Sequence, residues 1–80
     1  MNVSVLFFGI TKEKTGFSNY SFNLDPQSDL RVLEEELFRK FPKLKSEITF
    51  KFAVNNEYIL GNQVLNNGDE VALIPPVSGG

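Results

Sequence analysis

The sequence contains no histidine, cysteine or tryptophan. Without His and Cys, the chain has no ligand set for a zinc finger or an iron–sulfur cluster, and no Ser–His or Cys–His nucleophile pair. The lack of Cys also excludes a disulfide framework, which suits a protein of a reducing compartment. We therefore expect neither a metal site nor a bound cofactor.

Strong charge and long hydrophobic runs are also lacking. Eight basic against ten acidic residues give a net charge of −2, which disfavours general binding to nucleic acids or anionic membranes. The apolar run near the N-terminus, Val5 to Phe8, is too short for a signal peptide or a membrane span. We expect a cytoplasmic protein with neither a nucleic-acid nor a membrane partner.

The 80 residues are enough for one small domain and leave no room for a second. A chain of this size buries roughly 60% of its surface on folding. That is workable here, because 41% of the residues are hydrophobic and eight are Phe.

The most apolar segments lie at the two ends of the chain. Residues 2–8 carry apolar side chains on both parities, which predicts a central strand covered on both faces. Residues 70–74 form a second apolar strand. Residues 10–15, polar and bracketed by glycines, predict a loop, and the alternation in residues 17–24 predicts a half-exposed strand antiparallel to the first.

One amphipathic helix is predicted in the middle of the chain. Its apolar residues recur at helical spacing: Leu30, Leu33, Leu37 and Phe41. Ser28 or Asp29 is expected to cap its N-terminus, and Pro42 should stop it at Phe41.

Strands 50–54 and 57–60 should flank a hairpin turn at Asn55 and Asn56, and a second turn precedes residue 70. The two apolar end strands are most stable side by side and parallel, with the helix crossing one face. The expected fold is therefore an α+β, ubiquitin-like β-grasp roll: a mixed sheet of four to five strands with one main helix. Residues 1–76 would form the domain and residues 77–80 a flexible Gly-Gly tail.

The C-terminal segment looks presented rather than packed. Pro75 and Pro76 cannot donate to a sheet ladder and direct the chain away from it, and Gly79 and Gly80 lack the Cβ that a narrow channel would exclude. A carboxylate is a poor electrophile until it is activated, for example as an acyl-adenylate. The chain has no phosphate-binding Gly-x4-Gly-Lys loop, so another protein would have to activate it.

The run from Leu65 to Gly80 resembles the C-terminal signature of the sulfur-carrier small subunit of molybdopterin synthase. It contains the pattern Leu-x-x-Gly-Asp-Glu-Val, an apolar strand and the ending Pro-Pro-Val-Ser-Gly-Gly. The opening residues 3–8, the helix end at Phe41-Pro42 and the run Ala53-Val54-Asn55 also fit that family.

The resemblance implies a sulfur carrier for molybdenum cofactor biosynthesis. An adenylating enzyme of the ubiquitin-activating type would join Gly80 to AMP, and a sulfurtransferase would supply the sulfur of a C-terminal thiocarboxylate. The large synthase subunit, in a heterotetramer, would accept the tail, which comprises Pro75, Pro76, Val77, Ser78, Gly79 and Gly80. There the sulfur would pass to cyclic pyranopterin monophosphate, so the resemblance implies a donor subunit with no catalytic residues of its own. The uncovered sheet face is the expected dock.

Three alternatives stay open. The chain could carry sulfur for thiazole synthesis or tRNA thiolation, modify target lysines through Gly80, or be a plain interaction domain with an idle tail. A group of basic residues lies at the end of the predicted helix and beyond it. We interpret it as a solvated helix end and loop in preference to a phosphate-binding site: Arg39, Lys40, Lys43, Lys45 and Lys51.

Overall fold

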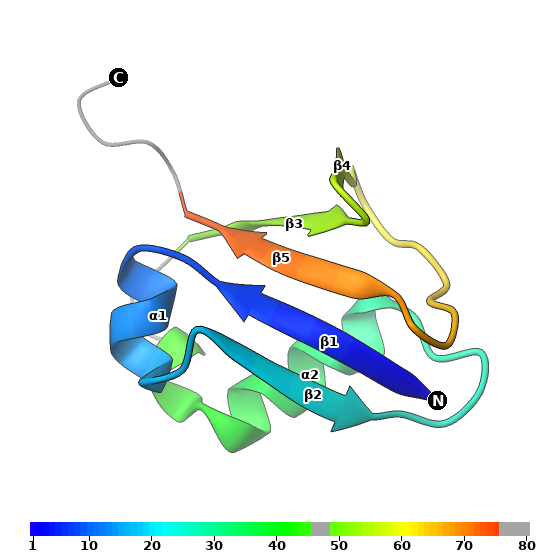
Figure 1. The fold of residues 1–80 in the computed structure, drawn as a ribbon, viewed down its shortest axis with the longest axis horizontal. Helices are drawn as coiled ribbons and strands as arrows, with labels where there is room; N and C mark the ends of the chain where they lie inside the picture. The colour runs from blue at the N-terminus through cyan, green and yellow to red at the C-terminus, as the bar shows by residue number, and fades with distance from the viewer. Residues whose placement is uncertain (46–48, 76–80) are drawn as a thin grey trace.

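The computed structural model describes residues 1–45 and 49–75. These residues form one five-stranded sheet with the strand order β2-β1-β5-β3-β4 and one long helix across a face of it (Figure 1). The strands are β1 (Asn2–Phe7), β2 (Asn19–Asn23), β3 (Lys51–Val54), β4 (Glu57–Tyr58) and β5 (Glu70–Ile74). This mixed α+β sheet with its single main helix confirms the predicted β-grasp roll.

The first and last strands lie side by side at the centre of the sheet. β1 and β5 pair in parallel, with Val5 opposite Val71 and Phe7 opposite Leu73. All four side chains are buried on the face that the long helix covers. The predicted parallel central pair is confirmed, and it places the C-terminal end of β5 beside the C-terminal end of β1.

The expectation that the first strand is covered on both faces is wrong. On the face away from the helix, Leu6 is only half-buried and Phe8, just beyond the strand, is 47% exposed. Odd- and even-numbered positions of this segment both carry apolar side chains, although no described helix covers the second face of the sheet. An apolar open face is the first structural sign of a docking surface.

The long helix α2 (Leu30–Lys40) begins and ends as predicted. Asp29 is its N-cap, and the carboxylate accepts a hydrogen bond from the Val32 N–H at 3.0 Å. The buried residues Leu30, Leu33 and Leu37 face the sheet. Phe41 is the C-cap, and a short 3₁₀ helix that the sequence did not predict, η1 (Pro42–Lys45), follows it.

Residues 10–15 form a short helix, α1 (Ile10–Thr15), instead of the predicted loop. The glycines on either side have positive φ angles and bound the helix: Gly9 at 55° and Gly16 at 78°. Thr11 is fully buried, and this tertiary anchor holds a six-residue segment too short to show helical periodicity.

The remaining elements follow the prediction with shorter strands. β2 runs antiparallel to β1, and β3 and β4 form the hairpin around Asn55 and Asn56, whose φ angles are 50° and 72°. Asn tolerates this left-handed conformation better than other non-glycine residues. In the described residues, no helix combines the length and apolar composition that crossing a bilayer requires.

Candidate functional site

The candidate site starts where the central strand β5 ends. β5 is bonded on both sides up to Leu73, which pairs with Phe7 of β1 and with Phe52 of β3, and Ile74 pairs with Lys51 of β3. Pro75 follows and is half-buried. The other predicted tail residues lie outside the described part of the chain: Pro76, Val77, Ser78, Gly79 and Gly80. The structure therefore places the base of the tail at the end of the best-anchored strand.

The turn between β1 and α1 abuts that base. A Cβ on Gly9 would lie 3.2 Å from the Pro75 Cγ, closer than ordinary van der Waals contact. The turn is held by Thr11, whose Oγ1 donates to the Phe8 carbonyl at 2.7 Å and accepts from the Phe8 N–H at 2.9 Å. These bonds satisfy a buried hydroxyl and make the turn a rigid support for Pro75.

An apolar patch, the open-face patch, lies on the uncovered side of the sheet. The strand register aligns Leu6 with Ala72 and Ala72 with Ala53, and Ala53 faces Tyr58. These side chains line a shallow groove of about 240 Å³ together with Phe8, Asn56 and Ile74. Tyr58 is 65% exposed, so two aromatic side chains, Phe8 and Tyr58, are available for contact here.

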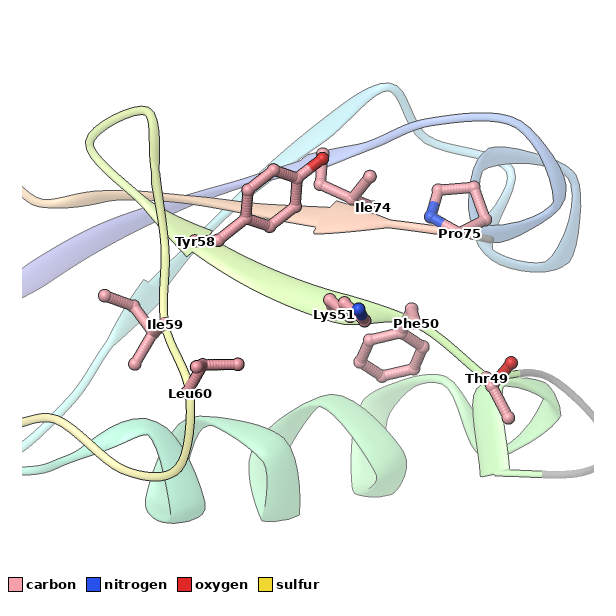
Figure 2. A pocket seen from close by; sticks show the side chains of 8 residues that line it. All are labelled: Thr49, Phe50, Lys51, Tyr58, Ile59, Leu60, Ile74 and Pro75. Carbon is pink, nitrogen blue, oxygen red and sulfur yellow. The ribbon is translucent and has the colours of Figure 1, made fainter. Parts of the chain in front are cut away.

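A larger groove of about 720 Å³ runs along the β3–β4 side of the tail base. Figure 2 shows Ile74 and Pro75 along one side of it and Ile59 and Leu60 along another. Leu60 is 91% exposed, the highest value among the exposed large hydrophobic residues of the described chain. Because Tyr58 and Ile74 line both grooves, the two apolar surfaces are continuous around the end of β5.

The described residues offer little chemistry of their own. Within residues 1–45 and 49–75, no group of three or more carboxylate, imidazole or thiol side chains is placed to hold a metal ion. The pKa of Asp29 is lowered from its ordinary value of 3.8, chiefly by the hydrogen bond from Asn62 and next by that from the Val32 N–H. Asp29 caps α2 at the end of the molecule opposite Pro75, so its lowered pKa reflects helix capping and not a role in the candidate site.

The basic residues noted in the sequence lie on exposed surface, as expected. Arg39 pairs with Glu36 at 3.1 Å, and the Lys40 ammonium lies 5.3 Å from the centre of the Tyr20 ring.

Glu34 is half-buried and lines a shallow groove together with Phe52, which fits a position at the edge of the helix's apolar face.

Gly9, Thr11 and the members of the open-face patch are site residues that the sequence did not single out. The alternation of residues 2–8 contained a signal for the patch, because Leu6 and Phe8 lie on the parity opposite Val3, Val5 and Phe7. The support of Pro75 by Gly9 joins residues far apart in sequence and had no local signal.

The fold and the tail base together define a ubiquitin-like β-grasp protein whose last strand leads into its C-terminal segment. Residues 5–80 match the ThiS family. The chain belongs to the ThiS family, and that match includes the tail residues that the structure does not describe.

Named relatives agree with this assignment. The chain is 36% identical to the "Molybdopterin synthase sulfur carrier subunit" of Chlamydomonas reinhardtii, with the whole of both chains covered. It is 33% identical, with a TM-score of 0.75 and both chains fully covered, to a solved structure titled "Protein-protein complex of subunit 1 and 2 of Molybdopterin-converting factor from Helicobacter pylori 26695". SAMP1 from Haloferax volcanii, at 24% identity, full coverage of both chains and a TM-score of 0.90, shares the fold.

Proposed function

We propose that this chain is the sulfur carrier subunit of molybdopterin synthase and that the C-terminal carboxyl group of Gly80 carries the sulfur. One observation carries the proposal: a relative bearing that name matches the chain over its full length. The ending Pro-Pro-Val-Ser-Gly-Gly lies within the segment that matches the ThiS family.

The proposed chemistry is the cycle that the family resemblance implies. A carboxylate oxygen of Gly80 would attack the α-phosphorus of ATP on an adenylating enzyme of the ubiquitin-activating type, with pyrophosphate leaving. A persulfide sulfur from a sulfurtransferase would then displace AMP and form an acyl disulfide. A second thiol of the partner proteins would attack the partner's sulfur of that S–S bond, which leaves the thiocarboxylate on Gly80 and a disulfide on the partner. A chain without His or Cys supplies neither an imidazole base nor a thiol for these steps, so the partners must supply the thiols.

The division between domain and tail fits delivery inside a partner. A thiocarboxylate is exposed to hydrolysis in water, so a site that excludes water protects it. Six residues from Pro75 onward would span about 20 Å when extended, which is enough to enter a partner while the domain stays outside. We propose that residues 77–80 act as the flexible tail and that the large synthase subunit accepts it, in a heterotetramer, for transfer to cyclic pyranopterin monophosphate.

The open-face patch is the proposed docking surface for that large subunit. It is apolar, carries Phe8 and Tyr58 exposed, and ends at Ile74, directly before the tail. The relative from Helicobacter pylori is part of a two-subunit complex, which supports a large-subunit partner. The cysteine-free composition supports the cytoplasm as the compartment of this exchange.

Deleting Gly80 tests the proposal. The full chain and the shortened chain would be incubated with the adenylating enzyme, the sulfurtransferase, the large subunit and the pterin substrate. We expect the shortened chain to produce no molybdopterin while its thermal unfolding stays unchanged, because the core residues of the described chain all lie between Val3 and Leu73. Ser78→Ala, which keeps both terminal glycines, is the matched control and should remain active. Molybdopterin formation by the chain without Gly80 would overturn the proposal.

A further inference from the structure

The basic residues of the chain gather at one end of the molecule, the end from which the tail leaves. α1 follows β1 there, α2 and η1 finish there, and β3 starts there because it runs antiparallel to β5 (Figure 1). Apart from Arg31, every Lys and Arg lies on these segments: Lys12, Lys14, Arg39, Lys40, Lys43, Lys45 and Lys51. We call this surface the basic end.

The opposite end carries five of the ten acidic residues, whereas Glu13 lies on α1 at the basic end and Glu34, Glu35 and Glu36 lie along α2. β5 begins there, β2 finishes there and α2 starts there, close to the β3–β4 hairpin (Figure 1). Its carboxylates are Asp25, Asp29, Glu57, Asp69 and Glu70. A chain of net charge −2 therefore has an uneven charge distribution along its strands, with an excess of cations at the tail base.

The basic end borders the proposed docking surface. Lys51 is the register partner of Ile74 and lies in the groove beside Pro75. Lys12 and Lys14 are exposed on α1, directly after the turn that supports Pro75. Exposed cations at the rim of an apolar patch set orientation and association rate more than final affinity.

We propose that the basic end steers the carrier onto a partner protein whose tail-accepting entrance is rimmed with carboxylates. This inference rests on the proposed function and adds the charge of the partner's rim. Opposite fields at the two ends of the carrier favour encounters in which the tail base leads. The acidic end would be repelled by the same rim, which disfavours reversed encounters.

The distribution of the cations favours an acidic protein surface over a small anion or a nucleic acid. A phosphate site needs several donors converging on one point, whereas these side chains are spread over four elements. The one described groove that contains two of them, Arg39 and Lys40, also contains Glu36, which already pairs with Arg39. The neighbouring apolar patch and the acidic far end suit a protein partner and not a polyanion.

The test measures the association rate with the large synthase subunit by stopped-flow mixing at several NaCl concentrations. The two variants are Lys14→Glu at the basic end and Arg31→Glu at the other end of the molecule. Both change exposed residues and both shift the net charge by the same amount, so any effect of total charge cancels. We expect Lys14→Glu to lower the association rate about 3- to 10-fold at low salt, and Arg31→Glu to leave it nearly unchanged.

Salt provides the second readout. At about 0.5 M NaCl the rates of all three proteins should converge, because the screening length falls to a few ångströms. A wild-type rate that does not depend on salt, or equal rates for the two variants at low salt, would overturn the steering and leave the proposed function intact. No binding of the wild-type chain at any salt concentration would overturn the proposed function as well.

Discussion

Gly9 lies against Pro75, and a Cβ built on Gly9 would come within 3.2 Å of the Pro75 Cγ. The backbone of Gly9 has a φ of 55°, a conformation that L-residues rarely adopt. The end of the first strand thus supports the residue at which the last strand passes into the tail. Because Thr11 holds this turn, the domain sets the position of Pro75, the first residue of the tail.

Gly9→Ala should impair sulfur delivery beyond its effect on stability. The variant introduces backbone strain of about 1–2 kcal/mol and also displaces Pro75 by a few tenths of an ångström. Gly16→Ala is the matched control, since Gly16 has a φ of 78° and nothing lies within 4 Å of an added Cβ. Gly9→Ala should lose more stability in urea titrations, because Gly9 combines a φ of 55° with a ψ of −128°, which a Cβ tolerates less well than the left-handed conformation of Gly16. Under conditions in which both variants are folded, only Gly9→Ala should slow single-turnover sulfur transfer. Equal transfer rates for the two variants would contradict the supporting role of this turn.

Phe8→Ala should weaken binding to the large subunit by about 30-fold, the effect of losing roughly 2 kcal/mol at an interface hot spot. Phe8 is 47% exposed on the open-face patch, so its truncation should change the melting temperature little. Val32→Ala removes an exposed apolar side chain from α2, on the covered side of the sheet, and should bind as the wild type does. Calorimetric titration of the large subunit with each variant gives the comparison, and equal affinities would remove the open-face patch from the interface.

Asn55→Ala should destabilise the domain by about 1–2 kcal/mol, because it removes two hydrogen bonds, one of them to the carboxylate of the buried residue Asp69. The Asn55 amide donates to the Asp69 carboxylate at 3.0 Å and accepts from the Glu70 N–H at 3.0 Å. Asn56→Ala is the control, since Asn56 has the same left-handed backbone in the same turn. Urea denaturation should show the larger loss for Asn55→Ala. A loss no larger than that of Asn56→Ala would mean that these bonds contribute nothing beyond the turn conformation.

The depressed pKa of Asp29 predicts a loss of stability in acid. In the folded chain the hydrogen bonds from Asn62 and the Val32 N–H favour the ionised carboxyl, so its pKa lies below the ordinary 3.8. This contribution is present above pH 3.8 and is lost as the pH falls through the folded-state pKa. Asp29→Asn keeps a side chain that caps helices well but does not titrate there. Its thermal stability should therefore fall less between pH 5 and about pH 2 than that of the wild type, and parallel curves would contradict the assignment.

Much of the fold could be predicted from periodicity alone. The spacing of Leu30, Leu33 and Leu37 and the block at Pro42 located α2, and the apolar end strands indicated the parallel central pair. α1 escaped prediction because its six residues are mostly polar and depend on Thr11 being buried in the tertiary fold.

For the candidate site too, the features that are local in sequence could be predicted and those that depend on tertiary contacts could not. The family signature was readable in the residues from Leu65 to Gly80, since it is local in sequence. The apolar parity of Leu6 and Phe8 was also readable, yet it indicated a second covered face until the sheet was seen to be open there. The contact between Gly9 and Pro75 depends on the parallel register of β1 and β5, which no local pattern specifies.

The central claim is that Gly80 becomes a thiocarboxylate, and the intact mass of the chain tests it most directly. The chain would be expressed with its native C-terminus, with and without the adenylating enzyme and the sulfurtransferase, and weighed by mass spectrometry. We predict that co-expression makes the chain heavier by the difference between one sulfur and one oxygen atom, with the change located at Gly80. An unchanged mass in the presence of both enzymes, or Gly80 found joined to lysines of other proteins instead, would contradict the account.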